Sequence, residues 1–376
     1  MSDHLTPVRA AELAMAVYGI QYNQNVVMGF AGEGMGHLNT EYDTGNATVV
    51  SGSSGAGMLK PETGFGVIMK SNKNPNEVVV TTRGTASLAD WLSNANTGFE
   101  RGPGGYLVHS GFHRIYKGFK SEMLSTVRSM RPGLIHCVGH SLGGALANQV
   151  AFDLKQSVGC DIKLYTYGAP RVGMSGFSSA LTSALSASNV HRVFHPADPV
   201  PWVPIFPFQH VTEGIALPNT GLDFNPFKHK MGSSYKPAVE GLSWGSIAGS
   251  HDRTTGNVEK ALEFASEVAT FPGTGLWAIT KALGYIWELA RPIVGISITV
   301  GVTMIDYVAM MLARAAEISK EIGWYLGKLI EIVMRFIGKA AAGAYEVTKA
   351  VLSYILQMLF QGLAIVARKA LRGPFT

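Results

Sequence analysis

The stretch LIHCVGHSLGGALANQVAFDLKQ, residues 134–156, constrains the fold more than any other part of the chain. Its first six residues form an apolar run that predicts a buried strand. The part from residue 142 onward predicts a helix, because apolar side chains recur every four positions, at Leu142, Leu146, Val150 and Leu154. Between the two, the pattern G-x-S-x-G surrounds Ser141, and a sharp strand-to-helix turn of this kind presents a serine hydroxyl above a sheet. The stretch therefore predicts an α/β fold with Ser141 as a candidate nucleophile.

The same serine pattern occurs a second time, in GLSWG at 241–245 around Ser243. The chain holds 44 glycines, so a match without its structural context carries little weight. Ser243 follows SYKPAVE, which is not a strong strand, and precedes SIAGSHDR, which is not a striped helix. We therefore expect Ser141, and not Ser243, to be the reactive serine.

Strand and helix signals alternate from residue 64 to residue 195. Strands are predicted over 64–70, 77–85, 134–139, 162–170 and 191–195, and helices over 111–130, 142–156 and 173–187. This alternation is typical of an α/β fold around a mostly parallel central sheet. Before it, residues 7–20 predict a helix, and 29–66, rich in Gly, Ser, Asn and Thr, predict loops and short strands.

The amino-terminal segment does not resemble a secretory signal peptide. It carries Asp3, Arg9 and Glu12 and lacks a clean apolar core before a small-residue cleavage site. We expect an amphipathic helix of the mature protein, and we expect any export of the chain to proceed without a cleavable signal peptide.

The charge and cysteine content exclude several classes of protein. The net charge is +5 without a dense Lys/Arg run, which argues against nucleic acid as a partner and favours mild attraction to an anionic membrane surface. Cys137 and Cys160 form neither a disulfide framework nor a zinc-binding spacing. We expect no metal site and no organic cofactor.

The composition changes near residue 255. We expect residues 1–254 to form the α/β domain and residues 255–376 to form an apolar α-helical, membrane-associating region. Residues 293–313 contain one charge, Asp306, and residues 350–367 contain none. A run of about 20 apolar residues can span a bilayer. A bundle that lies on the membrane surface, or that packs against protein, fits the same composition.

A reactive serine needs a histidine base and an acid that orients it. In α/β hydrolases these follow the serine in the order acid, then histidine. Asp198 comes directly after the strand at 191–195 and is favoured over Asp153 and Asp161. Three later histidines fit this order, and the residues alone leave the choice open among His210, His229 and His251.

Six motifs together resemble the class 3 lipases, a family of fungal-lipase-like α/β hydrolases. They are VVVTTRGTASLADW, VHSGF, GHSLGGALA, YTYGAPRVG, DPVPWVP and HKMGSSY, in family order between about residues 64 and 240. The resemblance implies Ser141 as nucleophile, Asp198 as acid and His229 as base, with His251 as the alternative base. It does not extend to the carboxy-terminal region.

The resemblance also implies an oxyanion hole and a lid. The oxyanion donors would be the backbone N–H groups of Leu142 and Thr85. Residues 86–98 would form the lid, in which Trp91 and Leu92 supply the apolar face.

The expected activity is therefore that of a serine lipase or phospholipase that cleaves the carboxylic esters of membrane phospholipids or acylglycerols. The helical region would bring this domain to the membrane surface or bilayer. The alternative is a membrane-inserting, toxin-like protein whose helical region carries the main activity. The combination also resembles secreted bacterial lipase effectors, which need a cognate immunity protein. A peptidase, thioesterase or acyltransferase would share the serine turn.

Overall fold

The computed structural model describes residues 4–21, 25–53, 62–84, 98–218, 223–247, 257–294, 303–339 and 345–371. Among these residues, seven strands form one sheet in the order β1-β2-β3-β6-β7-β8-β9. Their bounds are β1 (Thr48–Ser53), β2 (Glu62–Lys70), β3 (Glu77–Thr82), β6 (Leu134–His140), β7 (Asp161–Tyr167), β8 (Val190–Phe194) and β9 (Ile215–Ala216). The strands from β3 to β9 run parallel, and β1 and β2 are antiparallel to their neighbours. The predicted α/β fold with a mostly parallel sheet is confirmed.

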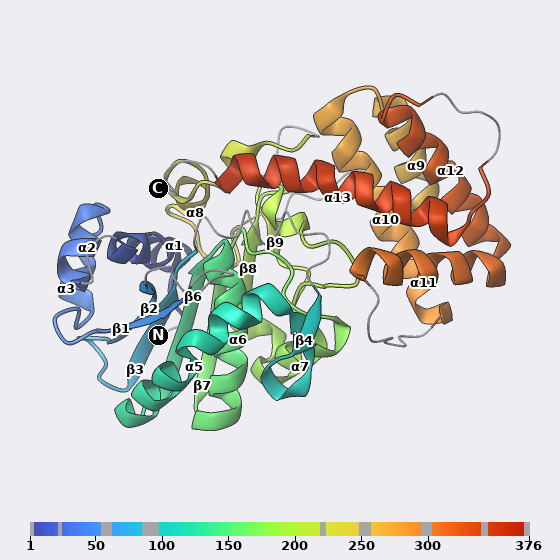
Figure 1. Cartoon of the computed structure of the whole chain (residues 1–376). Coiled ribbons are helices and arrows are strands. Elements are labelled where there is room, and N and C mark those ends of the chain that lie inside the picture. Colours follow the sequence, from blue (N-terminus) through green and yellow to red (C-terminus); the bar gives the residue numbers. More distant parts are fainter. Residues whose placement is uncertain are drawn as a thin grey trace.

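Helices cover both faces of this sheet (Figure 1). One face carries α5 (Ser110–Met130), α6 (Leu142–Val158) and α7 (Ser175–Leu185), and the other carries α1 (Pro7–Ala16) and α8 (Lys236–Val239). Strand β3 shows why two layers form: Val78 and Val80 belong to the core beneath α5 and α6, while Val79 belongs to the core beneath α1. Alternate side chains of a strand point to opposite faces, so both faces need cover. A small ribbon of β4 (Phe99–Arg101) and β5 (Leu107–His109) lies apart from the main sheet.

The glycine-rich stretch expected as loops and short strands holds helices α2 (Val26–Gly32) and α3 (Leu38–Glu41) as well as β1 and most of β2. The helix α2 begins where the Asn25 side chain accepts a hydrogen bond from the Met28 N–H at 3.1 Å. A Cβ added at Gly19 would lie 2.0 Å from the Gly29 carbonyl oxygen. The two glycines therefore let two backbone segments pack in contact. From composition alone, the same glycines indicate a loop.

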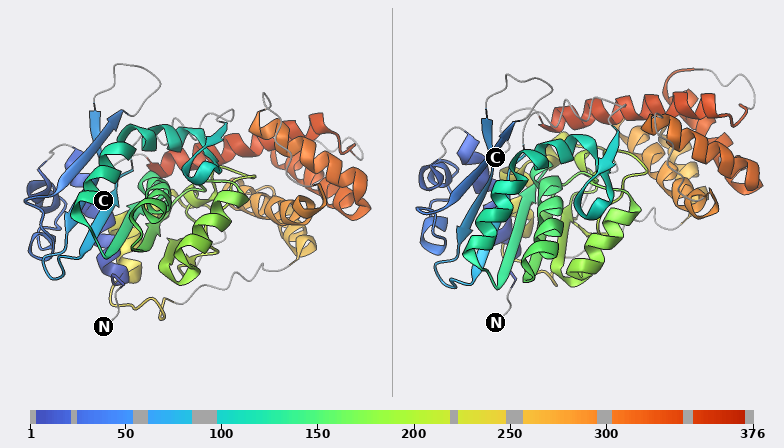
Figure 2. Two further views of the ribbon diagram at one scale, coloured as in Figure 1. Left: turned by 90° about the horizontal axis from the view of Figure 1, so that it is seen from below. Right: turned by 60° about the horizontal axis from the view of Figure 1, so that its bottom comes forward.

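The carboxy-terminal residues form helices α9 (Val258–Val268), α10 (Pro272–Val294), α11 (Met304–Ile318), α12 (Lys320–Phe336) and α13 (Lys349–Leu371). They lie at one end of the sheet, and α13 runs back from them above the carboxyl ends of the strands, where it contacts the short helix η5 (Pro226–His229) (Figures 1 and 2). The proposed boundary near residue 255 falls outside the described residues.

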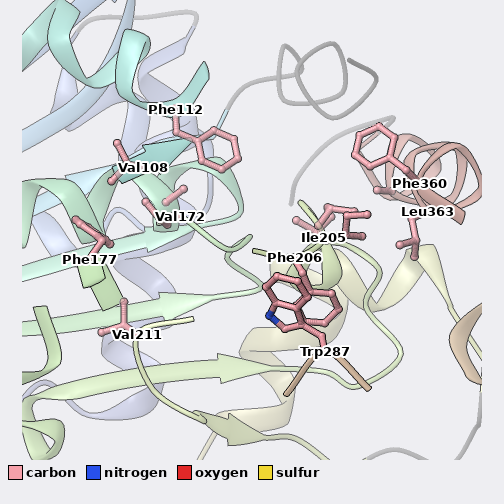
Figure 3. Close-up of a cluster of buried hydrophobic side chains, with 14 of the residues drawn as sticks. Val108, Phe112, Val172, Phe177, Ile205, Phe206, Val211, Trp287, Phe360 and Leu363 are labelled. Atoms are coloured by element: carbon pink, nitrogen blue, oxygen red, sulfur yellow. The ribbon is translucent and has the colours of Figure 1, made fainter. Parts of the chain in front are cut away.

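One apolar core joins the helical region to the sheet. The Phe206 and Trp287 rings stack at 5.7 Å between centroids, and Phe360 and Leu363 of α13 point toward the segment that carries Ile205 and Phe206 (Figure 3). The segment that follows Asp198 is therefore held from outside by the carboxy-terminal helices.

The apolar run at 293–313 is interrupted at Thr303, which is extended, and its residues 295–302 lie outside the described residues. The helix α10 ends at Val294, and α11 begins at Met304 after an extended Thr303. The Thr303 hydroxyl accepts from the Asp306 N–H at 3.1 Å and donates to the Asp306 carboxylate at 2.8 Å, so the single charge of the run caps a helix. Within the described residues, α13 alone has the length and apolar composition to cross a bilayer.

Candidate active site

The serine turn is tightly constrained by its neighbours. The residue Ser141 joins β6 to α6 with φ 57° and ψ −131°, a left-handed φ that only a strongly held backbone keeps. A Cβ at Gly139 would lie 2.4 Å from Gly143, and one at Gly143 would lie 2.2 Å from the Thr82 carbonyl oxygen. Both glycines are thus required by the close approach of the turn to itself and to β3.

A chain of hydrogen bonds runs from Ser141 through His229 to Asp198. The His229 Nε2 atom lies 2.9 Å from the Ser141 Oγ atom, and His229 Nδ1 lies 2.8 Å from Asp198 Oδ2. All three side chains have an exposed fraction of 0%. A nucleophile, a base within hydrogen-bond reach and a buried acid that orients the base form the arrangement of a serine triad.

The Asp198 carboxylate is fixed by two further donors. The Val200 N–H donates to its Oδ1 at 2.9 Å, and the Tyr235 hydroxyl donates to its Oδ2 at 2.7 Å. Burial, followed by the adjacent Asp198 charge, raises the pKa of Tyr235 well above its ordinary value, so the phenol remains a donor. At Gly168, which has φ 55°, a Cβ would lie 2.8 Å from Asp198 Oδ2. The site therefore leaves no room for a side chain at that position.

A second histidine holds the backbone of His229. The His140 Nε2 atom lies 2.8 Å from the His229 carbonyl oxygen, which can only accept, so Nε2 carries the proton. The His140 Nδ1 atom consequently accepts from the Tyr18 hydroxyl at 2.9 Å. Burial, together with the nearby His229, lowers the pKa of His140 well below its ordinary value, which keeps the ring neutral. The His140 ring lies beside the His229 ring, with 4.6 Å between the centroids.

Tyr18 reaches one residue further toward the expected oxyanion hole. Its hydroxyl oxygen accepts a backbone hydrogen bond from Gly84, which directly precedes Thr85. A Cβ at Gly84 would lie 2.7 Å from this hydroxyl. Tyr18 therefore connects the turn before Thr85, through His140, to the loop that carries His229.

Part of the predicted oxyanion hole lies within the described residues. The Leu142 N–H belongs to the first turn of α6, where amides have no acceptor inside the helix. This amide and the positive end of the helix are available to a developing oxyanion beside Ser141. Thr85, Trp91 and Leu92 lie outside the described residues, as does all of the expected lid at 86–98 except Gly98. The alternative base His251 lies outside them as well.

The other candidates from the sequence lie elsewhere. The His210 Nε2 atom donates to the Pro201 carbonyl oxygen at 2.8 Å, Asp153 accepts from Tyr116 at 2.6 Å, and Asp161 is exposed at the start of β7. The Ser243 hydroxyl bonds Ser246 in an exposed turn. In the described part of the chain, His, Cys, Asp and Glu form no group of three or more that could hold a metal ion.

Sequence reasoning missed the roles of Tyr235 and Tyr18. The tyrosine at the end of HKMGSSY was available as a family motif, but its donation to Asp198 was not expected. No local pattern marks Tyr18, because its partner His140 lies 122 residues further along the chain.

Comparisons with known proteins agree with the sequence resemblance. Residues 79–208 match the family model described as Lipase (class 3). The secreted mono- and diacylglycerol lipase 1 of Fusarium solani is 32% identical over 186 residues, which cover 47% of this chain and 54% of the relative. The toxin TseL of Vibrio cholerae is 34% identical over 102 residues, which cover 27% of this chain and 15% of the toxin. This chain thus spans about half the length, or less, of these curated relatives.

The chain is also similar in part to solved structures. The mono- and diacylglycerol lipase of Aspergillus oryzae aligns with a TM-score of 0.43 and 24% identity. The alignment covers 58% of this chain and 83% of the lipase.

Proposed function

We propose, from the class 3 lipase match of residues 79–208, that this chain is a serine carboxylic ester hydrolase that acts on acylglycerol lipids. The observation that carries the proposal is the buried hydrogen-bond chain from Ser141 Oγ through His229 to Asp198 Oδ2. In this proposal Ser141 is the nucleophile, His229 the general base and Asp198 the residue that orients the base.

The proposed mechanism follows from these contacts. His229 Nε2 takes the Ser141 hydroxyl proton as Oγ attacks the ester carbonyl carbon. The Leu142 N–H, with Thr85 as the second donor implied by the family, would hold the oxyanion. The tetrahedral intermediate collapses when the carbon–oxygen bond to the alcohol breaks and His229 returns its proton to the leaving oxygen. Water, deprotonated by the same nitrogen, then releases the fatty acid from the acyl-enzyme.

A lipid substrate is supported by the apolar cover of the site. The helix α13 lies against η5, which carries His229, and its composition is that of a bilayer-crossing helix. The relative from Fusarium solani is described as acting on mono- and diacylglycerols. We propose that both phospholipids and acylglycerols are candidate substrates, and that α9–α13 bring the site to a membrane.

A second candidate is a membrane-inserting toxin in which the helical region carries the main effect. The similarity to the toxin TseL and the apolar α13 favour it. A secreted effector of this kind would be paired with an immunity protein in the producing cell.

Fatty-acid release distinguishes these proposals. Purified full-length protein and its Ser141→Ala variant are incubated with phosphatidylglycerol vesicles and, separately, with emulsified diacylglycerol. Release by the wild type that is absent in the variant supports the hydrolase, and the preferred substrate class follows from the two rates. Vesicle leakage that is equal in both proteins, without release from either substrate, would support the toxin instead. His229→Ala and His251→Ala then separate the two candidate bases.

A further inference from the structure

A cavity of about 150 Å³ lies beside the segment that follows Asp198. It is lined by Arg171, Arg192, Phe194, Pro201, Trp202 and His210. Arg171 follows the carboxyl end of β7, and Arg192 belongs to β8. None of these six residues has a part in the serine chemistry proposed above.

Arg192 is buried, with an exposed fraction of 7%. Its Nε donates to the Thr212 carbonyl oxygen at 3.0 Å, and its Nη2 donates to the Glu213 carbonyl oxygen. At Gly214, which has φ 80°, a Cβ would lie 2.6 Å from this Nε. The absence of a side chain at Gly214 thus leaves the space that the Arg192 guanidinium group occupies.

Arg171 approaches from the other side of the same cavity. Its Nη1 donates to the carbonyl oxygens of Trp202 at 2.6 Å and Pro204 at 3.0 Å. Its Cζ lies 5.1 Å from the centre of the Phe206 ring, which stacks on Trp287 (Figure 3). The carboxy-terminal helices therefore support the position of this guanidinium group.

Each arginine keeps N–H groups that bond no protein acceptor within the described residues. These groups are on Nη1 of Arg192 and on Nε and Nη2 of Arg171, and none of these atoms is sealed from solvent. No ion pair joins either guanidinium group to a carboxylate of the described residues, and Glu213 and Glu288 act only from a greater distance. Two cations thus line one cavity, and no carboxylate from the described part of the chain contacts either of them.

The electrostatic cost of this arrangement is visible in the pKa values. Burial lowers the pKa of Arg171 to about 10, and burial together with Arg171 lowers the pKa of Arg192 to about 9. Burial and both arginines also lower the pKa of His210, which keeps its ring neutral. Guanidinium groups that are largely buried, and whose acceptors among the described residues are backbone carbonyl oxygens, carry a desolvation cost. A bound anion in contact with both groups would remove most of that cost.

We propose that this cavity binds a phosphate group, held by Arg171 and Arg192 and bounded by the Trp202 and Phe194 rings. Planar guanidinium groups match the geometry of phosphate oxygens and donate two parallel hydrogen bonds. The phosphate belongs either to a free anion or to a phospholipid headgroup. The site is separate from Ser141, and its occupancy does not depend on ester hydrolysis.

The position of the site gives occupancy a structural consequence. Pro201 and Trp202 are three and four residues beyond Asp198, and the Trp202 ring lies 6.2 Å from the Trp277 ring of α10. A bound phosphate would therefore tie together the segment after Asp198, the loop after β8 and, through Trp202, the carboxy-terminal helices.

Isothermal titration of inorganic phosphate into the full-length Ser141→Ala protein tests the proposal, with sodium chloride at matched ionic strength as the reference titration. The Ser141→Ala background keeps lipid probes intact, so a failure of the hydrolase proposal does not affect this result. We expect saturable binding with one site. We expect Arg192→Gln to weaken it at least tenfold and the control Arg128→Gln, which changes an exposed arginine of α5, to leave it unchanged.

Further titrations keep the proposal falsifiable and identify the source of the phosphate. Should Arg192→Gln fail to fold, Arg171→Lys keeps the charge but removes the planar donor pair, and it should also weaken binding at least tenfold. Binding of monomeric short-chain phosphatidylglycerol that inorganic phosphate displaces would assign a headgroup. Binding of inorganic phosphate alone would assign a free anion. No saturable binding of either probe up to millimolar concentrations, or equal binding by Arg192→Gln, would overturn the site.

Discussion

At the scale of single residues, the candidate site depends on groups beyond Ser141, His229 and Asp198. The pair Tyr18 and His140 links the turn before Thr85 to the carbonyl oxygen of His229 through contacts of 2.9 Å (Tyr18 to His140) and 2.8 Å (His140 to His229). Ser141 and Asp198 follow from motif and chain order, whereas chain order leaves three histidines open and His229 is singled out only by the family resemblance. Tyr18 follows from neither, because it lies just after α1, and its contact with His140 requires the packing of α1 against β6.

Tyr18→Phe tests this link. The change leaves His140 Nδ1 and the Gly84 N–H without their partner, and an unsatisfied buried polar group costs about 1–3 kcal/mol. We expect kcat on a soluble ester to fall about tenfold with KM nearly unchanged, since about 1.4 kcal/mol of transition-state stabilisation corresponds to that factor. Steady-state kinetics on a short-chain nitrophenyl ester provide the measurement. An unchanged kcat in a variant that has lost stability would mean that Tyr18 serves folding alone.

At the scale of secondary-structure elements, helices and strands with a strong local sequence pattern were predicted correctly. Elements that depend on a contact between distant residues were not. The helix α6 and strand β6 were predicted to within two residues at each end, because the apolar stripe and the run of Leu134–Gly139 are strong signals. The helix α2 was not predicted, because its Gly29 serves a backbone contact with Gly19 of the short helix η1 (Val17–Gln21). The run at 293–313 gave no sign that Thr303 and Asp306 begin a new helix within it.

Leu363→Ala tests the packing of α13 on the α/β domain. Leu363 has an exposed fraction of 0%, and removal of a buried leucine side chain costs about 2–5 kcal/mol. Ile365, two residues further on the same helix, is 54% exposed and provides the matched control, for which we expect a change within about 0.5 kcal/mol. Urea unfolding of both variants measures the free energy of unfolding. Equal losses in the two variants would show that α13 does not pack against the protein as described.

At the scale of the whole molecule, buried neutral histidines make stability depend on pH. Burial lowers the pKa of His109 to about 3 and that of His195 to about 4, and it lowers the pKa of His140 as well. In the unfolded chain these histidines have pKa values of about 6.5. Below that pH the unfolded state binds protons that the folded state does not. The contribution of these neutral histidines to the free energy of unfolding is therefore fully present above about pH 6.5 and is lost as pH falls toward about 4.

We therefore expect the free energy of unfolding to decrease between pH 7 and pH 5. Each of these histidines contributes a slope of up to about 1.4 kcal/mol per pH unit. Urea titrations at pH 7.5, 6.0 and 5.0 measure the effect. Removal of one buried histidine, as in His109→Phe, should reduce the slope, and a stability that is flat or rises on acidification would contradict these assignments.

In the proposed function, the whole fold serves to activate Ser141 through His229. Labelling with a fluorophosphonate, which loses fluoride to an activated serine, tests it most directly. We predict one covalent adduct per chain, located on Ser141 by peptide mass spectrometry, that is lost in Ser141→Ala and strongly slowed in His229→Ala. An adduct on Ser243, or equal labelling of the wild type and His229→Ala, would contradict the claim.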